Sequence, residues 1–163
     1  MTKQAWICSV LLCSVLALPA RAQREAVRAQ DAYNRGDYAT ALREWRQMAD
    51  RGYAAAQCNV GVLYARGEGV PQDTAEAARW YRKAAETGHA RAQYNLGSMY
   101  DNGDGVAQDY VQSYMWLSLA ASRVSRDQKK FSDRRDEVAG KMTPAQIAEA
   151  QALARKWRPK RKP

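Results

Sequence analysis

The stretch AAAQCNVGVLYARGEGVPQD, residues 54–73, decides the fold because it returns 36 residues later as ARAQYNLGSMYDNGDGVAQD, residues 90–109. The two copies share alanine, glutamine, asparagine, glycine and tyrosine at matching positions, and the match continues to Trp80 and Trp116. A half-unit at the same offset precedes them, beginning at Asp37. A fixed period of this length indicates a repeat architecture in which neighbouring units stack on one another.

The first half of the unit predicts a helix over 54–66. Ala56 and Leu63 fall on one face at helical spacing, and Gly61 leaves room on the helix for close approach of a second helix. Two glycines and then Pro71 predict a left-handed cap and a turn, because proline cannot continue a helix. Each unit therefore begins with a helix that ends in a glycine-rich loop.

The second half of each unit carries the signal of a helix start. Asp73 with Glu76, and Asp109 with Gln112, fit a capping box, in which both side chains bind backbone amides of the first turn. A single hairpin of this kind buries too little apolar surface to be stable alone. We therefore predict an all-α chain of stacked helical hairpins.

The pattern A-x-A-Q-x-N-x-G-x-x-Y-x-x-G-x-G-V-x-x-D, followed by tryptophan and an Ala-Ala pair, resembles the Sel-1-like repeat, a relative of the tetratricopeptide repeat. The resemblance covers two full units, 53–88 and 89–124. The leading hairpin, 23–52, is closer to an ordinary tetratricopeptide repeat. The resemblance implies a right-handed α-solenoid whose concave face is lined by the first helices. It further implies an adaptor in protein complexes and no catalysed reaction.

An open solenoid exposes an apolar end, and residues 125–157 are predicted to cover it as a pair of capping helices. The first, over 125–140, is strongly charged. Thr143 before Pro144, with Gln146 completing a capping box, predicts the start of the last helix. The stripe expected to face the second full unit consists of Ile147, Ala150, Ala154 and Trp157.

The amino-terminal segment, residues 1–22, has the pattern of a signal peptide. Lys3 precedes an uncharged apolar run over 5–18, and small residues at Ala20 and Ala22 fit a signal peptidase site. We expect cleavage after Ala22, an exported bacterial protein in the periplasm or outside the cell, and no transmembrane helix after cleavage. An uncleaved amino-terminal anchor is the alternative.

Charge and cysteine content restrict the expected partners. After cleavage Cys58 would be the only cysteine, so no disulfide is expected. Residues 123–163 hold 13 lysines and arginines against 5 acids, and the basic tail, 158–163, is expected to be disordered. The tail is either a solvated end or a weak contact for anionic membrane or envelope polymers. Nucleic acid does not fit an exported protein.

The resemblance implies a binding groove for a protein or peptide on the first helices. In it, Asn59 and Asn95 precede the motif glycine, where an amide either binds the backbone of an extended peptide or holds its own turn. Cys58 is expected to be a small buried thiol. The groove positions carried over from the superfamily are Asn59, Arg66, Arg91, Tyr94, Asn95 and Asn102, together with Cys58, Val62 and Ser98.

The sequence contains few residues that could form an active site. His89 is the only histidine, and the calcium-like loop over 101–105 has a counterpart, 65–69, that keeps the glycines and loses aspartates. Some cysteine-rich secreted relatives are linked to β-lactam binding or hydrolysis, which is the alternative function. This chain lacks their cysteine pairs and any S-x-x-K motif. We expect no reaction, no metal and no cofactor.

Overall fold

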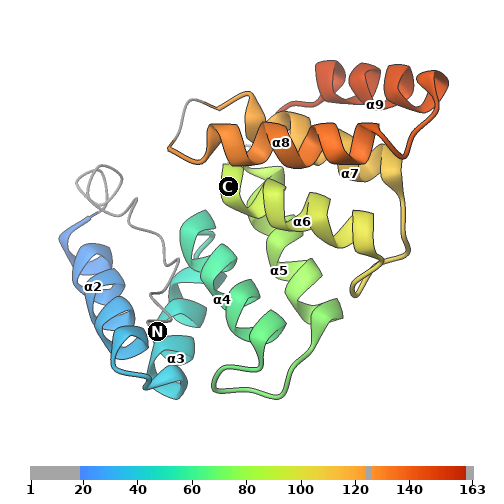
Figure 1. Ribbon diagram of the computed structural model, residues 1–163. Coiled ribbons are helices and arrows are strands. Elements are labelled where there is room, and N and C mark those ends of the chain that lie inside the picture. The colour runs from blue at the N-terminus through green and yellow to red at the C-terminus, as the bar shows by residue number, and fades with distance from the viewer. Residues whose placement is uncertain (1–18, 124–125, 161–163) are drawn as a thin grey trace.

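The computed structural model describes residues 19–123 and 126–160, and this part of the chain folds into helices without strands (Figure 1). From α2 to α8, helices that follow one another in sequence pack side by side, whereas α9 packs on α7, and α2 and α9 lie at opposite ends of the stack. No helix within these ranges is long and apolar enough to cross a bilayer. The predicted all-α solenoid is thus confirmed. The helices are α2 (Ala20–Asn34), α3 (Tyr38–Asp50), α4 (Ala54–Arg66), α5 (Thr74–Glu86), α6 (Ala90–Asn102), α7 (Tyr110–Ala121), α8 (Gln128–Ala139) and α9 (Pro144–Lys156).

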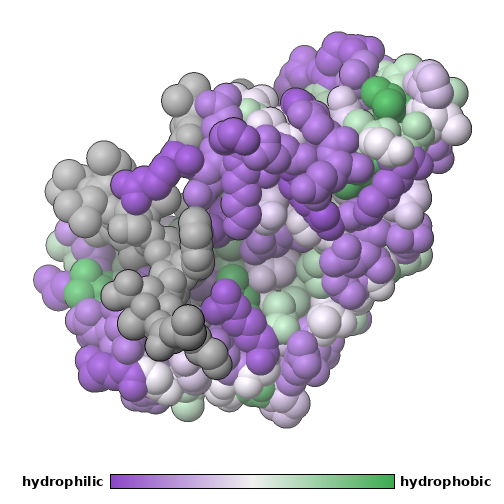
Figure 2. Space-filling view, viewed as in Figure 1, coloured by the Kyte–Doolittle hydropathy of each residue, from purple (hydrophilic) through white to green (hydrophobic). Residues whose placement is uncertain are grey.

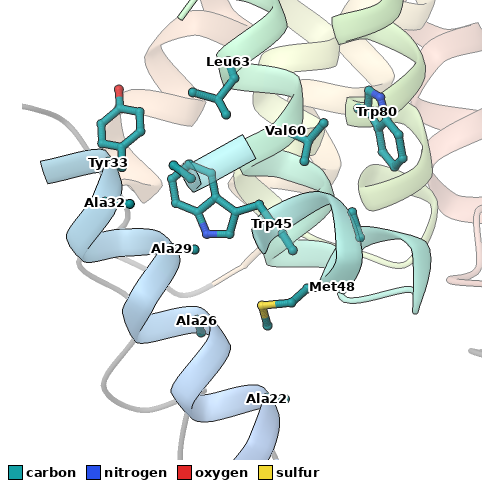
Figure 3. Close-up of a cluster of buried hydrophobic side chains, with 13 residues drawn as sticks. Ala22, Ala26, Ala29, Ala32, Tyr33, Trp45, Met48, Val60, Leu63 and Trp80 are labelled. Atoms are coloured by element: carbon teal, nitrogen blue, oxygen red, sulfur yellow. The ribbon is translucent and has the colours of Figure 1, made fainter. Parts of the chain in front are cut away.

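The leading hairpin starts earlier than predicted. Helix α2 begins at Ala20, inside the segment expected to be a signal peptide, because its buried alanine stripe extends back to Ala22. Figure 3 shows this stripe facing Trp45 of α3. Residues 1–18 of the expected signal peptide lie outside the described part of the chain.

The two helices of each repeat approach closely at the motif glycine, as predicted. A Cβ atom on Gly61 would lie 2.7 Å from the ring of Tyr81, and one on Gly97 would lie 2.8 Å from Cγ of Leu117. Contacts this short would displace the neighbouring side chains. The glycine at this position therefore sets the spacing between the helices of a hairpin.

The predicted capping boxes of the second helices form only in part. Asp73 accepts a hydrogen bond from the Glu76 backbone, but its own amide already donates to the Tyr64 carbonyl at 3.0 Å. The Glu76 carboxylate instead accepts from the Trp80 indole at 2.9 Å. Asp109 repeats the half box, with its amide bound to the preceding first helix. The prediction of full capping boxes was wrong. The backbone amide of each cap residue is already bound to a carbonyl of the preceding first helix, so the third helical residue does not accept from it.

The repeated glutamines join consecutive hairpins. Gln57 donates to the Ala49 carbonyl and Gln93 donates to the Ala85 carbonyl, both at 3.1 Å and both buried. Each bond runs from a first helix to the second helix of the preceding hairpin. The motif glutamine thus stabilises the stacking of neighbouring units.

The two carboxy-terminal helices, here called the capping hairpin, each pack on α7 of the second full repeat, as predicted. Helix α8 buries Phe131 and Val138, and α9 lies against α7 and buries Ala150. The Thr143 capping box is complete, and the Trp157 ring meets Trp116 edge-on at 6.3 Å. The pair of helices therefore covers the apolar face of α7.

The basic tail, which was predicted to be disordered, contacts the end of α5 through Lys160. Lys160 donates from its backbone to the Glu86 carbonyl at 2.8 Å and from its ammonium to the Glu86 carboxylate at 2.7 Å. The end of α5 thus provides two acceptors that hold the tail against the stack. Residues 161–163 of the predicted tail lie outside the described part.

Candidate functional site

An open groove of about 1120 Å³ lies between α6 and α8, next to the loop that follows α4. Figure 2 shows a mainly hydrophilic surface over α8, with neutral and apolar residues reaching the surface below it. The size and shape of this groove suit a segment of chain better than a small enclosed ligand. Its α6 wall consists of Tyr94, Asn95, Ser98 and Met99, and its α8 wall includes Lys129, Lys130, Asp133, Arg134 and Glu137.

Three of the predicted groove residues come together on the α6 wall. Tyr94, Asn95 and Ser98 lie on adjacent turns of one helix face. The Asn95 amide donates to the phenol of Tyr81, which lies on the groove floor, and burial raises the pKa of that phenol. Asn95 therefore has a partner within the chain at the point where it was expected to meet a ligand.

The capping helix completes the groove around Tyr94. The ring of Phe131 stacks on Tyr94 with centroids 4.9 Å apart, and the Lys130 ammonium lies 4.9 Å from the Tyr94 ring centroid. Lys130 lines the groove but was not predicted to, because it belongs to the helices expected only to cap the stack. The groove is thus lined by both the second repeat and the cap.

The charges that line the groove balance one another. Four lysines and arginines face four aspartates and glutamates. Lys129 pairs with Asp133 at 2.7 Å, and Arg134 pairs with Glu137 at 2.8 Å. Because opposite charges neutralise each other locally, the groove favours a polar partner of mixed charge over a strongly charged polymer.

The predicted residues of the first repeat do not line this groove. Asn59 and Cys58 are buried within the stack. Arg66 lies at the end of α4, where its guanidinium donates to the Tyr33 hydroxyl at 3.1 Å. Burial and the neighbouring Glu68 raise the pKa of Tyr33 to about 12. Arg66 therefore links the first full repeat to the leading hairpin.

The two remaining predicted residues lie near the groove but do not line it. Asn102 donates to Asp104 at 3.0 Å and accepts a bond from Arg134 at 3.3 Å, at one end of the groove. Arg91 is close enough to Tyr81 for its charge to lower the pKa of the phenol, opposing the effect of burial. Both polar groups therefore border the site.

A buried ion cluster that the repeat pattern does not predict lies beside the groove. The Asp101 carboxylate, with 0% of its side chain exposed, pairs with Arg134 at 2.6 Å and with Lys141 at 2.7 Å. Its equivalent in the first repeat is Ala65, and this departure from the repeat was the available signal. Both cations come from the capping hairpin, so the aspartate in the calcium-like loop binds protein cations.

His89 has a structural role before α6. Its Nδ1 accepts a hydrogen bond from the Ala92 amide at 3.3 Å, which makes the imidazole the cap of the helix. Burial, with a smaller effect from the Arg91 charge, lowers the pKa of His89 to about 4. The ring is therefore neutral near pH 7. Within the described ranges, no cluster of three or more His, Cys, Asp or Glu residues could hold a metal ion.

Comparisons with known proteins agree with this geometry. The Sel1 repeat family model matches residues 54–89 and 90–125, each starting one residue after the unit predicted from the period. A comparison with curated proteins finds no match.

Two solved structures are similar over most of the chain. One is c5321, a protective antigen present in uropathogenic Escherichia coli strains that displays an SLR fold. It is 33% identical with a TM-score of 0.76, and the match covers 83% of this chain and 29% of that chain. The chain thus spans less than a third of that antigen. The other is a Sel1 repeat protein from Oxalobacter formigenes, 30% identical with a TM-score of 0.53, over 68% of this chain and 98% of that chain. By its repeats, its fold and these relatives, the chain belongs to the Sel1 repeat proteins.

Proposed function

We propose that this protein is a non-catalytic scaffold of the bacterial cell envelope that binds an extended segment of a partner protein in the α6–α8 groove. Sel1 repeats generally mediate protein interactions. The observation that carries the proposal is the joint wall of Tyr94, Asn95 and Ser98 in a groove of about 1120 Å³. This volume slightly exceeds the usual range for small-molecule pockets, and the groove is open along its length.

The chemistry of the groove favours a peptide with alternating polar and apolar groups. The Asn95 amide lines the groove, and the donor and acceptor that it does not use on Tyr81 can exchange hydrogen bonds with a peptide backbone. The apolar floor formed by Tyr81 and Met99 can take a side chain. The paired charges on α8 can exchange partners with a peptide of mixed charge at little desolvation cost, because they are exposed.

The envelope location rests on the pattern of residues 1–22, which has the charge, apolar run and small residues of a signal peptide. Sel1 repeat proteins are generally non-catalytic scaffolds. The β-lactam alternative gains no support from the described residues, where Cys58 is buried and His89 caps a helix. We therefore propose no second function for the groove.

Site-specific photocrosslinking tests the groove. A benzoylphenylalanine at Lys129, on the groove wall, should give discrete adducts when the chain is exposed to an envelope extract. The same probe at exposed Gln47 of α3, which is remote from the lining residues, is the matched control. Adding Asn95→Ala to the Lys129 probe should weaken the adduct about fivefold, since a polar contact contributes about 1 kcal/mol. Identical adducts from Lys129 and Gln47, or none from Lys129, would contradict the proposal.

A further inference from the structure

Exposed basic side chains lie close together near the carboxyl ends of α5, α7 and α9. One comes from the last turn of α5, one follows α7, and four belong to the end of α9 and the residues after it. All six are exposed. We call this surface the basic end, and it consists of Lys83, Arg123, Arg155, Lys156, Arg158 and Lys160.

Specific contacts hold these segments together. Lys160 binds Glu86, the last residue of α5, through its backbone and its side chain. A Cβ atom on Gly88, two residues further along, would lie 2.6 Å from Nη2 of Arg123 and 3.6 Å from the ring of Trp157. The turn after α5 is therefore the place where the chain after α7 and the chain after α9 meet.

The basic end carries an excess of positive charge, unlike the groove. Among the described residues, Lys160 is the one member of the six that pairs with a carboxylate, that of Glu86. Six cations and one carboxylate leave a net charge of five. The one acid of α9, Glu149, precedes Arg155 by six residues, more than one helical turn. Several positive charges thus lie on the same surface of the molecule.

We propose that the basic end docks on the surface of an anionic lipid bilayer. The Arg158 guanidinium donates to the carbonyls of Arg155 and Trp157 at 2.8 and 2.7 Å, so part of its donor fork is occupied. Carboxylate recognition in an acidic peptide relies on such a fork, whereas a lipid surface responds to the total charge. The half-buried Trp157 adds an amphipathic ring of the kind found at membrane interfaces.

This inference is independent of the proposed groove function. None of the six basic residues lines the α6–α8 groove. A partner segment and a bilayer can therefore engage different residues of the same molecule. Loss of one interaction leaves the other to be measured separately.

Vesicle cosedimentation of the full chain tests the proposal. Binding is compared between neutral phosphatidylcholine vesicles and vesicles with 30 mol% phosphatidylglycerol, a composition of about the charge that anionic leaflets present. The test variant is Arg155→Gln with Lys156→Gln, and the matched control is Arg24→Gln with Arg35→Gln, two exposed positions on the leading hairpin. The gain in partition caused by phosphatidylglycerol should fall about thirtyfold in the test variant, equal to about 1 kcal/mol per removed charge. The control should keep most of it.

Salt and competing polyanions complete the experiment. The gain should fall steeply when sodium chloride is raised from 50 to about 300 mM, because salt screens exposed charges. Equal binding to neutral and anionic vesicles, or equal losses in both variants, would overturn the proposal. Capture by polyglutamate or duplex DNA that exceeds capture by the anionic vesicles, and that the test variant abolishes, would overturn the choice of lipid.

Discussion

Tyr53 and His89 occupy equivalent places in the two repeats, immediately before a first helix, but only the imidazole caps its helix. The Tyr53 side chain makes no capping hydrogen bond, whereas His89 accepts one from Ala92. Accepting this bond requires a neutral ring, because a protonated imidazole has no lone pair to offer. The stability of the second repeat therefore depends on the protonation state of one residue.

The first prediction concerns pH. The pKa of His89 falls from an ordinary value near 6.5 to about 4 on folding, so the unfolded chain binds a proton first as the pH drops. This contribution to the free energy of unfolding is fully present above pH 6.5 and is lost between pH 6.5 and 4. The loss should be about 3 kcal/mol, since the pKa falls by about 2.5 units and each unit corresponds to 1.36 kcal/mol. Urea unfolding at several pH values measures it.

The control for this prediction is His89→Asn, which keeps a capping acceptor that does not titrate. Its free energy of unfolding should vary less than that of the original chain between pH 6.5 and 4. The carboxylates of the chain titrate equally in both proteins, so the difference between the two pH dependences of the free energy of unfolding reports on the imidazole alone. Parallel curves for the two proteins would show that His89 does not carry this dependence.

At the scale of helices, α6 differs from α4 in what its last turn holds. The Asp101 carboxylate of α6 is bound by Arg134 of α8 and by Lys141 of the α8–α9 turn, which fixes the capping hairpin to the second repeat. In α4 the equivalent residue is Ala65, and the next hairpin follows without an ion cluster there. The chain thus departs from its repeat at the junction with the cap.

The second prediction is that Asp101→Ala loosens the capping hairpin. Removing one partner of a buried ion pair costs about 3 to 5 kcal/mol. Arg134 and Lys141 are 26% and 45% exposed and can regain water, so we expect about 1 to 3 kcal/mol. Hydrogen exchange should accelerate in α8 and α9 more than in α2 and α3. Asp104→Ala removes an exposed neighbouring acid and should change hydrogen exchange little. Equal effects of the two variants would contradict the role of the Asp101 ion cluster in holding α8 and α9 to the second repeat.

At the scale of the whole molecule, the stack has a continuous interior in which one cluster of side chains leads to the next. Trp80 belongs to the core cluster that also contains the buried residues of the leading hairpin (Figure 3). Tyr64 borders both that cluster and a second one, which the two full repeats form together. Trp157 of the cap packs on the same second core. Each hairpin therefore relies on its neighbours for burial of its apolar face.

The period predicted this architecture well because it depends on local pattern. The helix expected over 54–66 is α4, and the cap expected from Thr143 begins α9 with a complete box. Tyr94 and Asn95 were placed in the groove because the motif fixes their position on the first helix.

The parts that sequence could not predict depend on contacts between distant residues. Asp101 and Lys141 are 40 residues apart, and Lys160 and Glu86 are 74 apart, so no periodicity brings them together. Asn59 was expected in the groove beside Asn95, but it is buried, and the groove that Asn95 lines has α8 of the cap as its second wall. The groove depends on the irregular end of the stack, which the repeat pattern does not describe.

The most direct test of the stacked solenoid is the melting temperature of a chain that ends at Lys141. Without residues 142–163, the face of α7 that buries Ala150 and meets Trp157 opens to water. Loss of about 3 kcal/mol of apolar burial should lower the melting temperature of a chain of this size by about 10 °C or more. A chain lacking only 161–163 is the control. A melting temperature unchanged by the longer deletion would contradict the continuous interior on which the scaffold depends.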